Sequence, residues 1–487
     1  MSTRTAGRLP GEHTNPAGRE PSWLLTPADP NVLETQLWAT SVRKSPAGEL
    51  SVAGVSASAL AAAFGTPCFV IDEDDFRGRA RAFRQAFAGV DVYYAAKAFA
   101  CLATVSWVRE EGLSLDVCSG GELALALRAG FPPERIALHG NNKSVLELSR
   151  AVEAGVGRVI VDSAIEIDRL ADIAARRGVR QRVLVRVTPG VESHTHEHIA
   201  TAHEDQKFGF SIAGGDAFEA LRAVAGRKSL ALAGLHSHIG SQIFDTCGFE
   251  VAVRRVLALH ARGLSVGLTL PELNVGGGFG IAYTTQDDPA PPRALAAGIR
   301  ATVERECSAL GIDVPRLSIE PGRAIAGPST FTLYTVGTVK RVRLDGGSSR
   351  LYVAVDGGMS DNIRSALYGA DFSCTLASRW SSAAPALARV VGKHCEAGDV
   401  VVRDEFLPSD IGPGDLLAVP ATGAYCRSLA STYNHIPRAA VVAVRDGSAR
   451  LVVRRESEAD LLRWDVEESG APASGADSTA PVEAPPG

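Results

Sequence analysis

No apolar run in this 487-residue chain approaches the roughly 20 residues that a helix needs to span a bilayer. Residues 1–20 are polar, rich in Gly and Pro, and lack an apolar segment, so we expect no secretory signal. Neither sign of charge dominates. The formal net charge of −5 gives no electrostatic reason to expect binding to nucleic acid or to an anionic membrane. Membrane-spanning and nucleic-acid-binding functions are therefore excluded.

CxxC pairs are also missing. The eight cysteines are scattered, so neither a zinc site nor a disulfide framework is suggested, and most of them are expected to be small buried residues in a reducing cytoplasm. His194, His196 and His198 alternate in HTHEH. Because no HExxH pattern accompanies them, a polar loop explains them better than a metal site, and we expect no metal.

Length and composition predict two domains between disordered ends. A chain of 487 residues is too long for one ordinary core, and its 45% hydrophobic and 22% charged residues are typical of a globular protein. The ends are rich in Gly, Pro, Ala and Ser, with little to bury. We expect disordered tails over 1–22 and 466–487, a segment 23–72 that packs with a β-domain, a barrel over 73–328, and a C-terminal β-domain over 329–465.

Short apolar runs alternate with amphipathic stretches in the middle of the chain. After a first strand, CFVID, eight further runs lack polar alternation, as expected for parallel strands buried on both faces. Eight strand–helix units in about 250 residues predict a (β/α)8 barrel, with a doubly wound sheet as the alternative. The eight candidate strands cover 92–96, 113–117, 135–139, 158–162, 182–187, 231–239, 272–277 and 316–320.

Polar residues and glycines follow most of these strands. In a barrel, chemistry is expected where the strands end and the loops begin, so such residues would meet at one rim. One such placement would mean little, but seven of the eight strands show it. The rim residues are Lys97, Asp116, 119–122, 139–143, Arg186, 236–241, 276–280 and 320–323.

Several rim residues have a chemical interpretation beside a structural one. Lys97 could carry a Schiff base, because at a barrel mouth its pKa can fall, although an isolated lysine is more often a surface residue. Glycines 276–278 and the Ser241 hydroxyl could contact a phosphate. Glu320 could face a pyridine nitrogen, or else pair with a nearby arginine. His238 could lie against a cofactor ring, or else be a satisfied core residue.

Together these motifs resemble the fold-type III pyridoxal-phosphate (PLP) decarboxylases, which have an alanine-racemase-like (β/α)8 TIM barrel followed by a C-terminal β-sandwich or β-barrel domain. Within that group the chain is most similar to the diaminopimelate decarboxylases of actinobacterial type, over roughly residues 25 to 465. The strings occur in order, which makes the resemblance specific. They are YYAAKAF, HGNNKS, THEHIATAHEDQKFGF, GLHSHIGSQIF, GGGFG, EPGRAIAGP, DGGMSDNIRSALYGA, VVGKHCEAGD and ATGAYCRS.

The resemblance implies a role for each matching position. Lys97 is the implied attachment point of PLP, and Cys395 is the implied proton donor. Cys395 and Glu396 are implied to reach the site from the partner subunit of a homodimer. The other implied cofactor-binding residues are Asp116, His238, Ser241, Gly277, Gly278, Glu320, Gly322, Arg323 and Tyr425. The implied substrate-binding residues are Arg323, Arg364, Tyr368, Glu396 and Tyr425.

The implied reaction is the decarboxylation of meso-2,6-diaminopimelate to L-lysine and CO2, the last step of lysine biosynthesis. This substrate keeps a distal carboxylate, which a guanidinium can grip bidentately, so Arg364 favours it over ornithine. Ala397 stands where the family often has Ser, which removes one hydroxyl near the site. The alternatives are a related decarboxylase or racemase for another basic amino acid, and a non-catalytic PLP-binding homeostasis protein. The latter resembles only the barrel, so the β-domain with Cys395 and Tyr425 counts against it.

Overall fold

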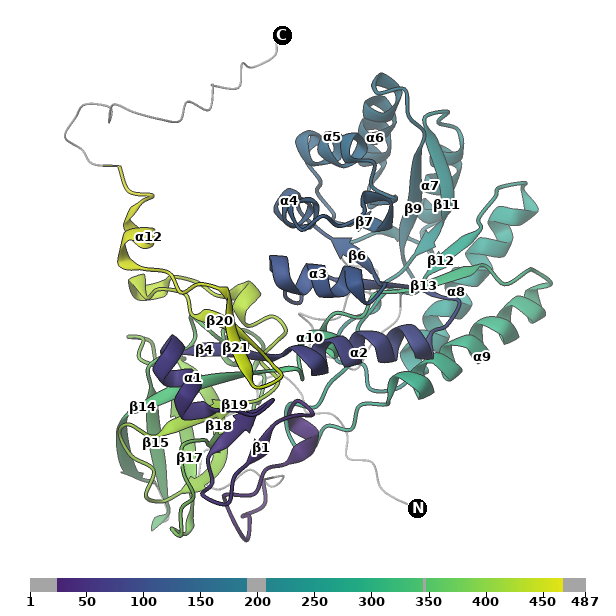
Figure 1. The fold of residues 1–487 in the computed structure, drawn as a ribbon. Coiled ribbons are helices and arrows are strands. Elements are labelled where there is room, and N and C mark those ends of the chain that lie inside the picture. The colour runs from purple at the N-terminus through teal and green to yellow at the C-terminus, as the bar shows by residue number, and fades with distance from the viewer. Residues whose placement is uncertain (1–23, 191–206, 345–346, 467–487) are drawn as a thin grey trace.

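The computed structural model describes residues 24–190, 207–344 and 347–466. Within these ranges the chain forms a barrel and a separate β-domain beside it (Figure 1). The loop with His194, His196 and His198 lies outside the described residues, as does nearly all of both expected tails. Among the described residues, no helix has the length and apolarity that crossing a membrane requires.

Eight parallel strands form the barrel, and β8 pairs with β9 to close it. The closure confirms the predicted (β/α)8 barrel and excludes the doubly wound sheet. A two-residue strand, β10 (Phe210–Ser211), pairs with β9 from outside the ring. The barrel strands are β5 (Asp91–Ala95), β6 (Ser114–Val117), β7 (Ile136–Leu138), β8 (Arg158–Val161), β9 (Gln181–Thr188), β11 (Leu230–His236), β12 (Glu272–Asn274) and β13 (Arg316–Ile319).

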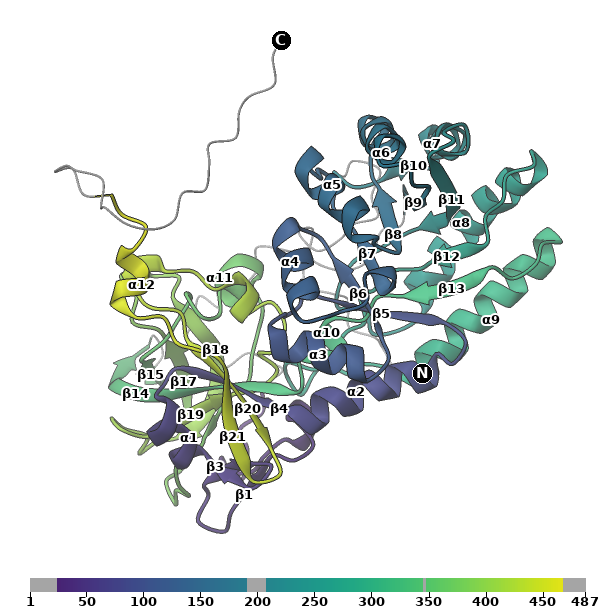
Figure 2. The same ribbon diagram turned by 45° about the horizontal axis from the view of Figure 1, so that its top comes forward.

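Helices surround the barrel and cover the outer faces of its strands (Figure 2). The helix that precedes the first barrel strand, α2, begins at the side chain of Asp72, which accepts a hydrogen bond from the backbone N–H of Asp75. It packs beside α9 and so completes the ring. The barrel helices are α2 (Glu73–Ala86), α3 (Leu102–Glu110), α4 (Gly120–Arg128), α5 (Val145–Ala154), α6 (Ala164–Arg176), α7 (Asp216–Ala225), α8 (Cys247–Ser265), α9 (Pro292–Leu310) and α10 (Arg323–Ala326).

An apolar layer crosses the middle of the barrel interior. Neighbouring side chains on a strand face opposite sides, so alternate residues of each strand point inward. Tyr93, Ala137, Ile160, Leu184 and Ala233 form a buried cluster of their own. This apolar layer lies beneath the polar residues at the C-terminal ends of the strands.

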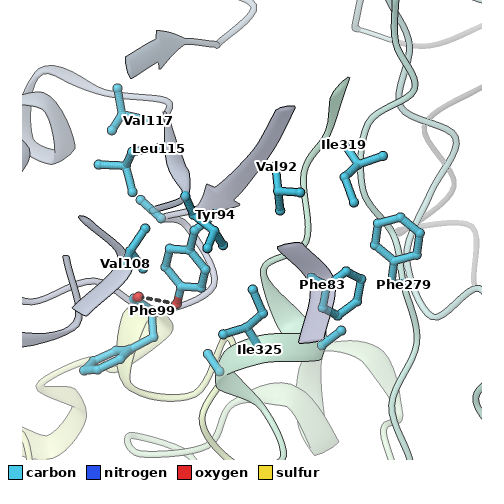
Figure 3. Packing of buried hydrophobic residues seen from close by; sticks show 14 of the residues in the cluster. Phe83, Val92, Tyr94, Phe99, Val108, Leu115, Val117, Phe279, Ile319 and Ile325 are labelled. Atoms are coloured by element: carbon cyan, nitrogen blue, oxygen red, sulfur yellow. Dashed lines mark hydrogen bonds between the residues drawn. The ribbon is translucent and has the colours of Figure 1, made fainter. Parts of the chain in front are cut away.

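Aromatic residues of the large buried cluster pack beside the first barrel strand, β5 (Figure 3). Phe83 of α2 packs against Phe279, with ring centroids 5.4 Å apart. The buried hydroxyl of Tyr94 donates a 2.6 Å hydrogen bond to the carbonyl of Phe99. Because this bond spans the turn after β5, it fixes the turn that carries Lys97.

The β-domain is built around a strand from the N-terminal segment. β4 (Cys68–Asp72) pairs antiparallel with β14 and parallel with β20, so residues far apart in sequence share one sheet. The other strands of this sheet are β14 (Thr330–Arg343), β15 (Ser349–Val355), β16 (Thr375–Leu376), β17 (Pro385–Val391), β18 (Val400–Pro408), β19 (Leu416–Val419), β20 (Ala440–Arg445) and β21 (Ser448–Val453).

Smaller elements complete the described chain. A three-stranded sheet precedes β4, and a short helix, α11 (Arg364–Tyr368), follows β15. The sheet consists of β1 (Arg43–Lys44), β2 (Leu50–Val52) and β3 (Val55–Ser56), and the remaining helices are α1 (Ala57–Phe64) and α12 (Glu458–Leu462), with 3-10 turns at Thr35–Leu37, Pro133–Arg135, Arg427–Leu429 and Tyr433–His435.

Candidate active site

A cavity of about 190 Å³ opens at the C-terminal ends of the barrel strands. Both domains contribute to its wall. The lining residues are Ala95, Lys97, His238, Gly240, Ser241, Gly278, Phe279, Glu320, Gly322 and Arg323 from the barrel, and Arg364, Tyr368 and Tyr425 from the β-domain. Asp116, Gly277, Cys395 and Glu396 are also predicted for the site, but they do not line this cavity.

Lys97 lies in the turn after β5 with its side chain in the cavity, accessible to solvent yet densely surrounded by protein atoms. Burial alone would lower the pKa of its ammonium group, but Tyr425, Asp116 and Glu320 outweigh burial and raise it. This corrects the sequence-based expectation that the pKa of Lys97 falls. The rim that encloses the lysine also surrounds it with carboxyl groups, which favour the charged form.

Glu320 is held as a carboxylate by three side chains. His236 Nε2 lies 3.1 Å from its Oε1 atom, His139 Nε2 lies 3.2 Å from it, and Asn274 Nδ2 donates a 2.7 Å hydrogen bond to it. Burial alone would raise the pKa of Glu320, but His139 and His236 hold it well below its usual range. A buried carboxylate of this kind can keep a proton on a basic ring nitrogen placed against it.

His139 lies between two carboxyl groups that titrate differently. Asp116 Oδ1 is 3.5 Å from His139 Nε2, and burial raises the pKa of Asp116 to about 6. Glu320, on the other side, stays ionised. His139, His236 and Glu320 place their ligand atoms within 4.8 Å of one another, a spacing that a metal ion could use. Their contacts with one another already account for this spacing.

The glycine run after β12 is required by close packing. A Cβ atom on Gly276, Gly277 or Gly278 would lie within 2.5 Å of a backbone oxygen from a neighbouring loop. The N–H of Gly277 donates a 3.1 Å hydrogen bond to Nδ1 of His238. Burial lowers the pKa of His238 well below its usual range, so the ring is neutral and carries its proton on Nε2. A neutral imidazole therefore faces the cavity.

Arg323 and Arg364 are buried cations that the described residues leave without a carboxylate. Arg323 donates to the Ser241 hydroxyl at 2.7 Å and to the Tyr283 hydroxyl, and Arg364 donates to the same Tyr283 oxygen at 2.7 Å and to the carbonyl of Ala424 at 3.4 Å. All of these acceptors are neutral. Other buried arginines of this chain, by contrast, have carboxylate partners, as in the pairs Arg158–Glu272 and Arg350–Asp404. Burying a cation without an anion costs free energy, so this corner of the cavity favours the binding of anionic ligands.

Two tyrosines complete the wall on the side of the β-domain. Tyr425 has a left-handed backbone with φ of 61°, which is costly for a residue with a side chain. Its N–H donates a 2.9 Å hydrogen bond to the carbonyl of Ala98, and its ring centroid lies 4.7 Å from Cζ of Arg323. Tyr368 ends α11, and its ring centroid lies 6.0 Å from Cζ of Arg364. The strained turn at Tyr425 thus brings an aromatic ring against Arg323.

Cys395 and Glu396 lie on the surface, in the loop between β17 and β18. The flanks of this loop are anchored. His394 is buried between Ser360, 2.9 Å from its Nε2 atom, and Asn434, 3.0 Å from its Nδ1 atom. The loop therefore presents Cys395 and Glu396 outward, and the structure does not bring them to the cavity of their own chain.

Two residues of this site, Asn274 and Tyr283, were missed from the sequence, and two others, His139 and His236, were placed on the rim without a role. His139, His236 and Asn274 support Glu320, and Tyr283 joins the two arginines. His236 lies in a rim motif, and the two-residue period of a strand gives a signal for it, because it places His236 and His238 on one face. Asn274 and Tyr283 carry no such signal, since each matters only through a partner distant in sequence.

The cavity fits PLP residue by residue. It offers a lysine amine, an ionised carboxylate, a neutral imidazole, and an arginine with a hydroxyl beside a glycine-rich loop for a phosphate. A (β/α)8 barrel with these groups on its C-terminal rim and a β-domain closing one side defines a fold-type III PLP enzyme.

Comparisons with known proteins agree with this assignment to the fold-type III PLP enzymes. Residues 73–327 match the family described as "Pyridoxal-dependent decarboxylase, pyridoxal binding domain". The diaminopimelate decarboxylase of Mycobacterium tuberculosis is 57% identical over 89% of this chain and 98% of its own, and that of Mycobacterium leprae is 54% identical over 96% of this chain and 100% of its own. The crystal structure of the diaminopimelate decarboxylase from M. jannaschii has a TM-score of 0.82 and 29% identity, covering 88% of this chain and 98% of that one. The chain belongs to the diaminopimelate decarboxylase family, and its cofactor is pyridoxal phosphate.

Proposed function

We propose that this chain decarboxylates meso-2,6-diaminopimelate to L-lysine and CO2, as the last step of lysine biosynthesis. The observation that carries the proposal is the pair of buried arginines, Arg323 and Arg364, without a carboxylate partner among the described residues. Two anions would satisfy them, a cofactor phosphate and a carboxylate of the substrate. Ornithine, by contrast, has only an amine at its distal end. The family relatives named above are diaminopimelate decarboxylases, which supports the same substrate.

Each residue has a role in this proposal. Lys97 holds the cofactor covalently through its amine, and Glu320 keeps a proton on the ring nitrogen. When bound, PLP draws in the electron pair left as the bond to CO2 breaks. His238 lies against the ring, and Tyr425 helps to hold the cofactor. The remaining cofactor contacts are proposed for Ser241, Gly278, Gly322 and Arg323, and the cofactor-binding residues Asp116 and Gly277 would act from behind the cavity wall through His139 and His238.

Protonation of the α-carbon completes the reaction. We assign the proton donor to the Sγ–H of Cys395 from the partner subunit of a homodimer, with the partner's Glu396 contacting the distal amine of the substrate. The exposed position of both residues, away from the cavity of their own chain, supports this sharing. Arg364 and Tyr368 of the first subunit hold the distal carboxylate. All eight cysteines are free, as suits the reducing cytoplasm in which we expect the enzyme to act.

A carbon dioxide release assay tests the proposal. The purified protein, supplied with PLP, would be offered meso-, LL- and DD-diaminopimelate, ornithine, arginine and lysine in parallel. We expect release from the meso isomer and at least a hundredfold less from ornithine, arginine and lysine, because an unsatisfied buried arginine costs a few kcal/mol. Faster release from ornithine or arginine would overturn the proposed substrate.

A further inference from the structure

Tyr283 lies behind the cavity wall, between the two arginines. Its side chain is 5% exposed, and its oxygen accepts a hydrogen bond from Nη1 of both Arg323 and Arg364. Its ring centroid lies 5.8 Å from Cζ of Arg323 and 4.9 Å from Cζ of Arg364. Two cations this close repel each other in a buried setting, so a shared oxygen and an electron-rich ring hold them together. Tyr283 thus sets the distance between the two positive charges.

Tyr283 is itself fixed from two directions. Its backbone N–H donates a 2.9 Å hydrogen bond to Oδ2 of Asp287, and its ring makes an edge-to-face contact with Phe372, with centroids 5.0 Å apart. Arg323 belongs to α10 at the barrel rim, whereas Arg364 begins α11 in the β-domain. The tyrosine therefore links the cations of the two domains through one rigid group.

The shared oxygen also decides which nitrogen of Arg364 remains as a donor. Nη1 is engaged by Tyr283 and Ala424, and Nε is buried without a hydrogen-bond partner among the described residues. Nη2 is therefore the nitrogen that Arg364 has left for a carboxylate in the cavity, to which a guanidinium donates a strong charge-assisted hydrogen bond. Without the Tyr283 hydroxyl, Arg364 could rotate and lose this presentation.

We propose that Tyr283 is a positioning residue that makes the site select ligands with a distal carboxylate. It acts through Arg364, because it does not line the cavity itself. The inference rests on the proposed function, since the distal carboxylate is that of diaminopimelate or of its product L-lysine. Tyr283 would thus contribute to specificity without touching the ligand.

A pair of ligands that differ by this one group tests the proposal. L-Lysine carries the carboxylate and cadaverine lacks it, and their affinities for the PLP-loaded enzyme can be measured by titration calorimetry. We expect Tyr283→Phe to weaken L-lysine about tenfold, equivalent to about 1.4 kcal/mol, and cadaverine less than twofold. Asp287→Asn, which weakens the anchor of Tyr283, should act in the same direction with a smaller effect. Tyr352→Phe, a tyrosine of β15 in the β-domain, is the matched control and should change neither affinity.

The outcomes distinguish a failure of the role inferred for Tyr283 from a failure of the proposed function. Equal weakening of both ligands would show that Tyr283 is only structural and would overturn the inference, as would unchanged binding of L-lysine to Tyr283→Phe. In both cases the proposed function would stand, provided that the wild-type enzyme binds L-lysine more tightly than cadaverine. If the wild-type enzyme shows no such preference, the distal-carboxylate subsite is wrong and both proposals fall.

Discussion

Both hydrogen bonds of the Asn274 side chain fix the orientation of its amide. Oδ1 accepts a 2.8 Å bond from the N–H of Gly276, so Nδ2 faces Glu320 and donates to it. An aspartate at this position would keep the shape and the acceptor but bring a second negative charge against Glu320. Two carboxylates at that distance cannot both ionise easily. The site therefore requires an amide at position 274, although an aspartate side chain would fit the same space.

Asn274→Asp should raise the pKa of Glu320, because a like charge disfavours its ionised form. If catalysis needs Glu320 ionised, the acid limb of the kcat–pH profile should move up by at least about one unit, so that kcat falls most at the acid end of the profile. Asn274→Leu is the control, since it removes the hydrogen bond without adding charge and should move the limb less. Profiles that coincide for both variants would contradict this role of charge.

Arg364 shows why a positive charge alone would not be sufficient to bind the distal carboxylate of the substrate. Its guanidinium donates to Tyr283 through Nη1 and keeps Nη2, on the far side of the planar group, as a separate donor, a combination that an ammonium group cannot reproduce. Arg364→Lys keeps the charge but should lower kcat/KM for meso-diaminopimelate at least about tenfold, or about 1.4 kcal/mol of transition-state binding. Steady-state kinetics checks this, with retained PLP absorbance as evidence of an intact cofactor site. Unchanged kinetics would remove Arg364 from the substrate site.

At the scale of elements, local patterns predicted the barrel well because its strands differ sharply from their surroundings. The predicted strand 92–96 corresponds to β5 and 182–187 lies within β9, while the predicted 231–239 overruns β11, which ends at His236. The overrun is physical, since Ser237 still donates a 2.9 Å hydrogen bond to the carbonyl of Asn274 on β12, although the strand itself ends at His236. The pairing of β4 with β14 and β20 unites segments that are distant in sequence, and no local sequence pattern predicts which strands pair in this way.

The loop between β15 and α11 contains another buried acid, Asp361. It is 1% exposed, accepts a 3.0 Å hydrogen bond from the N–H of Gly358, and has its pKa raised by burial to about 7. A carboxyl whose pKa is raised in the folded state stabilises the fold below its unfolded pKa of 3.8 and loses that contribution as pH rises through about 7. The loop that leads to Arg364 therefore becomes costlier to fold at neutral pH.

Asp361→Asn should remove this dependence on pH. The difference in unfolding free energy between variant and wild type should shift in favour of the variant between pH 4 and pH 8, by a few kcal/mol, since one pKa unit corresponds to about 1.4 kcal/mol. Urea unfolding of the PLP-loaded proteins at several pH values measures it. A difference that stays constant across this range would show that Asp361 titrates normally.

At the scale of the whole molecule, the site needs both domains and, by our proposal, two chains. The barrel supplies Lys97 and Glu320, and the β-domain supplies Arg364 and Tyr425. Cys395 lies on the surface of the β-domain, outside this cavity. Sequence patterns could identify Cys395 only through resemblance, because a lone exposed cysteine carries no signal of its own. Its exposure is the feature that a two-fold dimer with shared sites would explain.

Mixing two inactive variants tests this sharing. If Lys97 of one chain works with Cys395 of the other, the Lys97→Ala and Cys395→Ala homodimers should both be nearly inactive. A mixed dimer would then have one site with both residues and one site with neither. Random exchange makes about half of the dimers mixed, so activity should recover to about a quarter of wild type for a two-fold dimer.

The control for this experiment is a mixture without subunit exchange, which should stay inactive. Mass spectrometry of the intact dimers would show that exchange has occurred in the test sample. If Lys97 and Cys395 came from the same chain, every site in every dimer would lack one of them, and mixing would restore nothing. Absence of recovery after verified exchange would therefore refute the cross-subunit role of Cys395, whereas recovery near a quarter can arise only if each site draws on both chains.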